Sequence, residues 1–306
     1  MYVYDRPFDD ERRDFEKMWH FVRADYAARQ DHFIWLFSRL GDWKYGLWND
    51  QKCMPTFCRD HAQLWFGPFD ELLGFVLSEN GDNIFFIFTL PGCDYLYAEI
   101  LEWTVEHWMP RYGSLKTEVH EHQAGALIAL QRRGFHSNGI VATTRAYDIQ
   151  AVSENPLRLP EGFRILNMCE NTDERSKTLL YHNAYHNQDQ ISEFDLLTTV
   201  YSHQNPAYEP AFDFSVVTPE GVHVSSCVGF NDPVHGVAEI EKVCTHSRYR
   251  RLGLAEAVIR TCMQRLKARG IRRAYITGYS NEANGLYEKL GPCGCMRWFH
   301  YELKPG

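Results

Sequence analysis

The order of predicted elements in the second half of the chain repeats the order in the first half, and this repeat constrains the fold more than any other feature. With 306 residues, the chain has the length of about two ordinary domains. Residues 151–163, which carry two prolines and a Pro-Glu-Gly turn signal, separate the two patterned halves. We therefore expect two copies of one domain, over residues 1–150 and 164–306, joined by this linker.

Hydrophobic periodicity predicts the elements of each half. In the first half it predicts a hairpin, a helix, a strand, a second helix and a strand, over 72–77 with 84–90, 95–108, 115–119, 124–133 and 140–149. In the second half it predicts the same order with one more strand after the hairpin: a hairpin, a strand, a helix, a strand, a helix and a strand, over 214–217 with 222–230, 237–245, 254–268, 274–279, 283–290 and 296–303. Gly134, Gly270 and Gly291 mark the ends of three of these helices.

The formal net charge of −8 at pH 7 argues against a protein that binds nucleic acid through a basic surface, and it weakly favours amine substrates. The amino terminus is charged and has no apolar core, so it does not resemble a signal peptide. No stretch approaches the roughly 20 apolar residues of a membrane span. We expect a cytoplasmic protein with no nucleic-acid partner and no membrane partner; the sequence does not indicate its oligomeric state.

The nine cysteines are scattered without a disulfide framework, which is typical of reduced thiols. Cys53, Cys58 and His61 lie close together in the sequence, but no fourth ligand is evident and their spacing matches no zinc template. We therefore predict no metal site. Cys293 and Cys295 flank a glycine ahead of a predicted strand, where either a redox pair or ordinary packing fits the pattern.

The stretch from Thr245 to Val258, THSRYRRLGLAEAV, joins a predicted strand to a predicted helix through a glycine and several arginines. The first amides of such a helix have no partners within it, and the helix dipole adds partial positive charge at the same place. Gly253 lets the backbone approach a ligand closely, while Arg250 and Arg251 can donate charge-assisted hydrogen bonds. Several amides and two guanidinium groups together favour a diphosphate over a single carboxylate.

Residues 250–255 fit the pattern R/Q-x-x-G-x-G/A after a strand, and residues 283–291 read Ala-Asn-Gly-Leu-Tyr-Glu-Lys-Leu-Gly on a predicted helix. These stretches resemble the acetyl-CoA signature and the second signature of the GNAT superfamily of N-acetyltransferases. The resemblance covers the chain from about Phe212 onward, whereas residues 1–150 resemble the family in element order alone. It implies an α/β (α+β) fold of two tandem GNAT-like domains, each a mixed central sheet flanked by helices.

The first half departs from both signatures. Where the second half has the arginine loop, the first half reads IFTLPGCDYLYAEI, with no arginine and no Gly-x-Gly/Ala. When Gly134 is aligned with Gly291, Leu130 stands opposite Tyr287. We expect a degenerate first copy that cannot bind a diphosphate, an arrangement that resembles tandem GNAT proteins with one active and one inactive copy.

The resemblance implies acetyl-CoA as the acetyl donor and assigns residues to its binding. The backbone of Val243, Cys244 and Thr245, at the end of the strand predicted over 237–245, would contact the pantetheine arm and the thioester carbonyl. The other donor contacts would come from the arginine loop, the helix start and the second signature: Arg250, Arg251, Leu252, Gly253, Leu254, Ala255 and Asn284.

Tyr287 matches the family's general acid, since a phenol with a pKa of about 10 stays protonated at neutral pH and can donate to a thiolate. A core tyrosine on a short amphipathic helix is the alternative. Glu239 and Glu241 share one face of their strand, and Glu239 matches the position of a general base in several family members. Glu241 could instead pair with a neighbouring lysine or bind a substrate ammonium, and a water chain could replace a carboxylate base.

These residues lead to an acetyl-CoA-dependent N-acetyltransferase that moves an acetyl group to the primary amine of a small molecule, by direct transfer in a ternary complex. A peptide or protein amine is the alternative acceptor, because the sequence does not reveal how open the cleft is. Outside the enzymes, the alternative is a sensor or interaction protein that binds coenzyme A without turnover.

Overall fold

The computed structural model describes residues 3–155 and 158–305, and the chain divides into two compact units. Unit 1 contains Met1–Thr143 and Met296–Gly306, and unit 2 contains Thr144–Cys295. These units differ from the domains expected around the linker, because the last strand of the chain belongs mostly to unit 1 and the residues from Thr144 onward belong to unit 2. Of the linker, residues 156 and 157 lie outside the described part of the chain.

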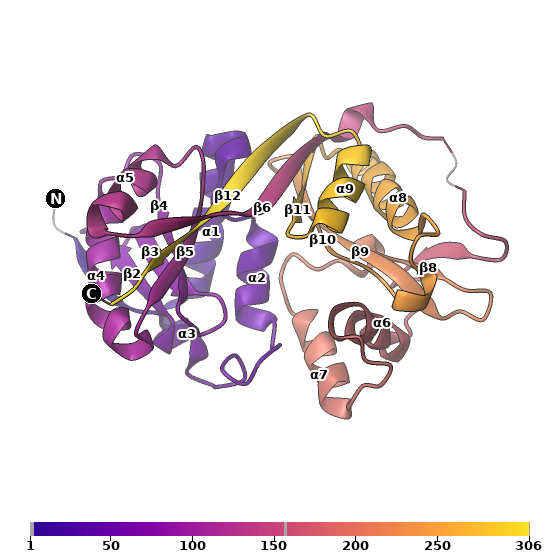
Figure 1. Cartoon of the computed structure of the whole chain (residues 1–306), viewed down its shortest axis with the longest axis horizontal. Helices are drawn as coiled ribbons and strands as arrows, with labels where there is room; N and C mark the ends of the chain where they lie inside the picture. The colour runs from indigo at the N-terminus through magenta and orange to yellow at the C-terminus, as the bar shows by residue number, and fades with distance from the viewer. Residues whose placement is uncertain (1–2, 156–157, 306) are drawn as a thin grey trace. The chain divides into compact units, whose positions relative to one another are not determined.

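Unit 1 is a mixed sheet with helices on both faces (Figure 1). Its strands follow the order β1 (Tyr4–Pro7), β2 (Ala62–Phe66), β3 (Leu72–Ser78), β4 (Ile84–Thr89), β5 (Leu115–His120) and β12 (Gly294–Leu303). Its helices are α1 (Asp14–Arg29), α2 (Phe37–Tyr45), α3 (Phe57–Asp60), α4 (Leu96–Tyr112) and α5 (Ala124–Arg133). Alternate side chains of β4 point to opposite faces of the sheet. Phe85 and Ile87 pack with α4 and α5, whereas Phe86 and Phe88 contact Trp35 just ahead of α2.

Unit 2 is a second mixed sheet with helices on both faces. Its strands follow the order β6 (His136–Asp148, of which the last five residues lie in this unit), β11 (Arg273–Gly278), β10 (Val237–Thr245), β9 (His223–Asp232), β8 (Asp213–Val217) and β7 (Arg164–Asn167). Its helices are α6 (Glu174–His186), α7 (Glu193–Ser202), α8 (Leu254–Ala268) and α9 (Asn281–Lys289). No helix in the described part of the chain is both long and apolar enough to cross a membrane.

Each unit takes strand residues from the other half of the sequence. In unit 1, β12 pairs with β5 in the antiparallel sense, from Trp298 opposite His120 to Leu303 opposite Leu115. In unit 2, the end of β6 lies beside β11, and the N–H of Cys293 donates to the carbonyl of Ala146 at 2.8 Å. Neither sheet is therefore completed by its own half of the chain, which is why the compact units do not begin and end at the linker.

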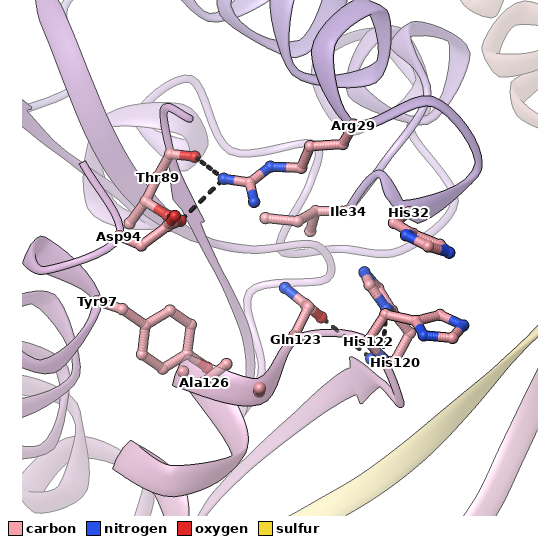
Figure 2. Close-up of a pocket in the computed structure, with 12 residues that line it drawn as sticks. Arg29, His32, Ile34, Thr89, Asp94, Tyr97, His120, His122, Gln123 and Ala126 are labelled. Carbon is pink, nitrogen blue, oxygen red and sulfur yellow. Dashed lines mark hydrogen bonds and ion pairs between the residues drawn. The ribbon is translucent and has the colours of Figure 1, made fainter. Parts of the chain in front are cut away.

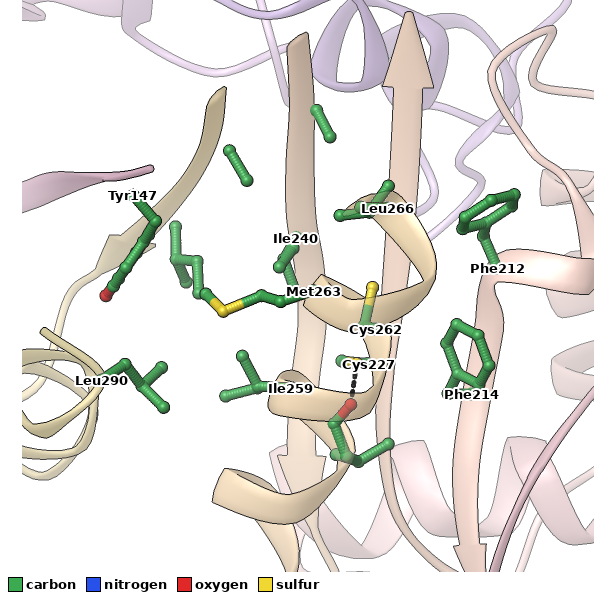
Figure 3. Close-up of a cluster of buried hydrophobic side chains, with 14 of the residues drawn as sticks. Tyr147, Phe212, Phe214, Cys227, Ile240, Ile259, Cys262, Met263, Leu266 and Leu290 are labelled. Carbon is green, nitrogen blue, oxygen red and sulfur yellow. Dashed lines mark hydrogen bonds between the residues drawn. The ribbon is translucent and has the colours of Figure 1, made fainter. Parts of the chain in front are cut away.

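Helices α8 and α9 cover one face of the unit 2 sheet around a single apolar core (Figure 3). Helix α8 has the bounds that the periodicity predicts, and the residues at its four-residue spacing are all buried: Leu254, Val258, Cys262 and Leu266. Figure 3 shows Ile259, Met263 and Leu266 beside Ile240 of β10, with Tyr147 and Leu290 to one side of the helix. Burial of these apolar side chains of α8 against the sheet fixes where the helix begins relative to the end of β10.

A buried ion pair holds α6 against the other face of the same sheet. Lys177 Nζ donates to the carboxylate of Asp213 at 2.5 Å and to the hydroxyls of Ser215 and Ser226 at 2.7 and 2.6 Å. The hydroxyl of Tyr208 donates to the second carboxylate oxygen of Asp213 at 3.1 Å. Lys177 is completely buried, so its charge is stable there only because each of these partners is present.

Replacing Lys177 with methionine leaves the Asp213 carboxylate buried without its cation, and we expect the free energy of unfolding to fall by about 3–5 kcal/mol. The double variant Lys177→Met/Asp213→Leu should recover most of this loss, because an apolar pair has no buried charge to compensate. Denaturant unfolding followed by circular dichroism measures both. A double variant as unstable as the single one would contradict this account of the pair.

Candidate active site

Strands β10 and β11 of unit 2 separate soon after they meet. Their parallel register runs from Val237 opposite Arg273 to Glu239 opposite Tyr275, while β10 continues to Thr245 and β11 to Gly278. Beyond Glu239, within the described residues, the edge of β10 that faces β11 has no strand partner. Backbone amides and carbonyls along that edge are therefore available to a ligand lying between the two strands.

A β-bulge sets the direction of the end of β10. Glu241 pairs with Val228 and Cys244 with Ser226, so two residues of β10 lie opposite one residue of β9. Lys242 at the bulge has a φ of 52°, in the left-handed region that residues with side chains seldom occupy.

The two residues that follow Lys242 at the bulge face opposite sides of the sheet. Val243 packs on the core beneath α8. Cys244 is buried toward Lys177 and Asp213, and this burial raises the pKa of its thiol to about 12. Val243, Cys244 and Thr245, the expected contacts of the pantetheine arm, therefore form the separated end of the strand.

The loop after β10 leads to a helix start that no side chain caps. Gly253 is the N-cap of α8 with a φ of 76°, a conformation that favours glycine. Arg251, Leu252 and Gly253 are exposed, and a Cβ built at Gly253 meets no atom within 4 Å. The first amides of α8, beginning at Leu254, are thus open to an anion rather than blocked by side chains.

The two arginines expected to hold phosphates have different surroundings. Arg250 donates from Nε to the carbonyl of Thr245 and from Nη2 to the carbonyl of Ala184, each at 3.3 Å, so it ties the loop to α6. Arg251 is exposed and, among the described residues, makes no hydrogen bond or ion pair. Its guanidinium can therefore meet a diphosphate without breaking a contact, whereas that of Arg250 is partly engaged.

Side chains at the end of α6 and in the loop that follows fix the backbone of the arginine loop. Asn183 accepts from the N–H of Ser247 at 2.6 Å and donates to Asp189 at 2.6 Å. Asp189 also accepts from Arg248 at 2.8 Å and lies 3.6 Å from Nε2 of His246. Because Nδ1 of His246 accepts from the N–H of Arg248 at 3.2 Å, this histidine supports the shape of the loop.

Tyr287 lies on α9 and is only 5% exposed. Burial and the nearby carboxylate of Glu241 raise the pKa of its phenol above the usual range. The hydroxyl donates no hydrogen bond to any described residue, while the backbone carbonyl of Tyr287 is held from behind by another side chain. The phenol is therefore neutral at physiological pH and has a proton to give.

Glu239 and Glu241 point away from the core beneath α8, because Ala238 and Ile240, which alternate with them, are buried in it. Glu239 is 6% exposed and lies where β10 still pairs with both neighbouring strands. Glu241 is half-buried, lies beyond the last β11 pair, and acts on the pKa of Tyr287. Of the two carboxylates, Glu241 therefore has the closer electrostatic link to the tyrosine.

Residues outside α9 hold Asn284 and Tyr287 in place. Arg145 donates from Nη1 to Oδ1 of Asn284 at 2.6 Å and from Nε to Glu288 at 3.0 Å. The hydroxyl of Tyr147 donates to the backbone carbonyl of Tyr287 at 2.8 Å. Arg145 and Tyr147 both lie at the end of β6, so a strand that begins in the first half of the chain positions the second signature.

The sequence patterns do not point to Arg145, Tyr147 or Tyr185. The first two act about 140 residues away from their own position, and no local pattern reveals such a contact. The ring of Tyr185 is half-exposed, but burial of its hydroxyl end and the neighbouring Cys244 and Glu241 raise its pKa. Its spacing of four residues from Tyr181 on one helix, where the two rings stack, is the signal that could have found it.

Comparisons with known proteins agree with this geometry. The sequence model described as the acetyltransferase (GNAT) family matches residues 179–291, which span α8, the arginine loop and α9. No curated protein sequence matches the chain.

Among solved structures, a GCN5-related N-acetyltransferase from Sphaerobacter thermophilus is 17% identical, with a TM-score of 0.62 over 99% of this chain and 96% of that one. A tandem GNAT protein from the clavulanic acid biosynthesis pathway is 13% identical, with a TM-score of 0.66 over 100% and 99% of the two chains. A GNAT-family acetyltransferase from Colwellia psychrerythraea is 12% identical, with a TM-score of 0.57 over 99% and 100%. At these identities the likeness shows the fold, and it extends over the whole length of the chain.

The family match and the uncapped helix beside a separated strand define an acyltransferase. Residues 179–291 match the GNAT acetyltransferase family, and the chain as a whole has the fold of a tandem GNAT protein.

The packing of α9 on β11 is testable at Gly278. A Cβ there would lie 2.6 Å from Oδ1 of Asn284 and 3.2 Å from the ring of Tyr287. We expect Gly278→Ala to displace α9 and lower the free energy of unfolding by about 1–3 kcal/mol. Gly285→Ala, at an open position on the same helix, should instead raise it by about 0.5–1 kcal/mol. Denaturant unfolding compares the two, and equal stabilities would refute the tight packing at Gly278.

Proposed function

We propose that unit 2 transfers the acetyl group of acetyl-CoA to the primary amine of a small molecule, by direct reaction between two bound substrates. The proposal rests on one arrangement of three groups in unit 2. The uncapped start of α8 lies beside the separated end of β10, and the buried phenol of Tyr287 lies next to that strand end. The family match supports acetyl transfer in general. Our proposal goes beyond this match in naming a small amine as the acceptor and a direct transfer as the mechanism.

The donor would lie along the groups that this geometry leaves available. The amides at Leu254 and Ala255 and the unpaired guanidinium of Arg251 would hold its diphosphate, with Arg250 keeping the loop in shape. The backbone from Val243 to Thr245 would contact the pantetheine arm. Leu252 and Gly253 are exposed in the loop just ahead of α8 and would contact the donor there. Asn284 could donate to it from Nδ2, because Arg145 engages only its Oδ1.

The chain's own groups can supply both proton transfers. As the bond from the amine nitrogen to the acetyl carbon forms, Glu241 or Glu239 would accept the proton that leaves the nitrogen, directly or through water. As the carbon–sulfur bond breaks, Tyr287 would donate its phenolic proton to the sulfur. Backbone N–H groups at the end of β10 would stabilise the charge on the carbonyl oxygen during the reaction.

A small amine is the acceptor that the charges favour. The chain carries a net charge of −8, and Glu239 and Glu241 face the same side of β10, so a cationic amine meets negative charge as it approaches. A peptide amine remains the second candidate, and a thiol-release screen of small amines against peptides separates the two. A sensor without turnover would release no thiol with any amine in the screen.

We also propose that unit 1 does not bind coenzyme A. Its equivalent of the arginine loop, between β4 and α4, contains no arginine. Its equivalent of Tyr287 is Leu130, which is completely buried and cannot give a proton.

Replacing Tyr287 with phenylalanine removes the proposed acid and nothing else from the ring. We expect kcat/KM for acetyl transfer to fall by about 100-fold or more, while the affinity for coenzyme A stays nearly unchanged. Thiol release at steady state measures the first quantity and calorimetry the second. If Tyr287→Phe retained full activity, Tyr287 would be a core residue and the acid would have to lie elsewhere.

Reversing the charge of Arg251 tests the diphosphate site. We expect Arg251→Glu to weaken coenzyme A binding by about 100-fold, because it replaces a free cation with an anion beside the helix start. Arg265→Glu, an exposed position farther along α8, is the matched control and should bind as the parent does. Isothermal titration should give one site per chain, and a second site of equal affinity would contradict the assignment to unit 2 alone.

A further inference from the structure

A cavity of about 370 Å³ lies within unit 1, near the ends of the neighbouring strands β4 and β5 (Figure 2). Strands β4 and β5 pair in parallel only at Ile84 with Lys116 and at Phe85 with Thr117, and then separate as β10 and β11 do. The residues that line the cavity come from the ends of these strands, from α1 and the loop after it, and from the starts of α4 and α5. Unit 1 has therefore kept the opening between its strands although it has lost the arginine loop.

One wall of the cavity is the start of α5, which no side chain caps. Gln123, the N-cap residue, instead accepts through Oε1 from the backbone N–H of His120 at 3.0 Å. Ala124 and Gly125 are exposed, and a Cβ built at Gly125 meets no atom within 4 Å. The first amides of α5 and the positive end of its dipole thus face open space.

Two buried side chains that line the same cavity carry polar atoms without a hydrogen-bond partner among the described residues. They are the hydroxyl of Tyr97, which is 6% exposed, and Nε2 of His120, which is 1% exposed. Nδ1 of His120 accepts from the N–H of His122 at 3.2 Å, so the neutral ring carries its proton on Nε2. Burial and the neighbouring histidines lower the pKa of His120 to about 3, which keeps the ring neutral. The hydroxyl of Tyr97 is therefore a hydrogen-bond donor that lacks an acceptor, whereas the ring of His120 lies close enough to the backbone of His32 to interact with it weakly.

The charges around the cavity limit what can fill it. Arg29, the cation in its wall, already donates to Asp25 at 2.5 Å, to Asp94 at 2.9 Å and to the carbonyl of Thr89 at 3.1 Å. With these carboxylates in place, no excess positive charge is left for a diphosphate or a dianionic phosphate. Ile34, a buried residue in the lining of the cavity, adds an apolar surface.

We propose that this cavity binds an organic monocarboxylate with a short apolar tail. Its carboxylate accepts from the first amides of α5, from Tyr97 and from His120, and its tail lies against Ile34. A monoanion suits the helix dipole and the neutral donors, and the buried hydroxyl of Tyr97 gains the acceptor that it lacks. This site is distinct from the one that transfers acetyl groups, and its occupancy does not depend on the proposed reaction.

Calorimetric titration of the full chain with hexanoate tests the site directly. We expect one bound hexanoate per chain, with binding at least about tenfold weaker for hexanamide, which lacks the charge. Gly125→Leu fills the mouth of the cavity and should abolish binding, whereas Gln131→Leu, an exposed position on the same helix outside the cavity, should leave it unchanged. Preference for inorganic phosphate or coenzyme A, equal binding of hexanamide, or hexanoate binding unaffected by Gly125→Leu would overturn the proposal.

Tyr97→Phe gives a second test that survives if Gly125→Leu does not fold. Removal of a hydroxyl that lacks a partner should leave the unfolding midpoint of the unliganded chain unchanged or raise it. The same change should weaken hexanoate binding by about fivefold, since one hydrogen bond to the carboxylate is lost. A purely structural tyrosine would lower the midpoint and leave affinity unchanged, and that result would contradict the site.

Discussion

The early end of the pairing between β10 and β11 is the constraint on which the site in unit 2 depends. Two parallel strands paired along their whole length would satisfy each other's amides and carbonyls and leave no room for a substrate between them. Here the register with β11 ends at Glu239, and the bulge at Lys242 shifts the register between β10 and β9 before the last residues of β10. The backbone groups released in this way bind through geometry rather than side-chain identity, which is consistent with a shared fold at 12–17% identity.

The two units share an opening between separated parallel strands, but different side chains surround it. In both, a parallel pair separates and an uncapped helix start faces the opening, although this helix is α8 in unit 2 and α5, the counterpart of α9, in unit 1. Unit 2 adds the free cation of Arg251 and the phenol of Tyr287, which suit a diphosphate and a departing thiolate. Unit 1 adds a paired arginine and two neutral donors, which suit a single negative charge. A repeated domain can thus change its ligand by changing a few side chains around an opening that the backbone provides.

Much of the fold follows from local patterns. Helices α5 and α8 and strand β10 have the predicted bounds, because their ends are set by nearby glycines and by the spacing of buried residues. The exchange of β6 and β12 could not be predicted, since it depends on pairing between residues far apart in sequence, and it places Arg145 and Tyr147 behind α9. The sequence pattern assigns the same phosphate-binding role to Arg250 and Arg251. In the structure, only Arg250 donates hydrogen bonds to backbone carbonyls. The pattern predicts a first half without a diphosphate site, but a cavity formed by strand separation leaves no signature in the residues.

A crystal structure of the full chain with bound coenzyme A is the decisive test of the donor site in unit 2. We expect the diphosphate within hydrogen-bonding distance of the amides at Leu254 and Ala255, with the pantetheine arm between β10 and β11 and no coenzyme in the cavity of unit 1. Coenzyme A bound in the unit 1 cavity, or phosphates placed away from the start of α8, would contradict it.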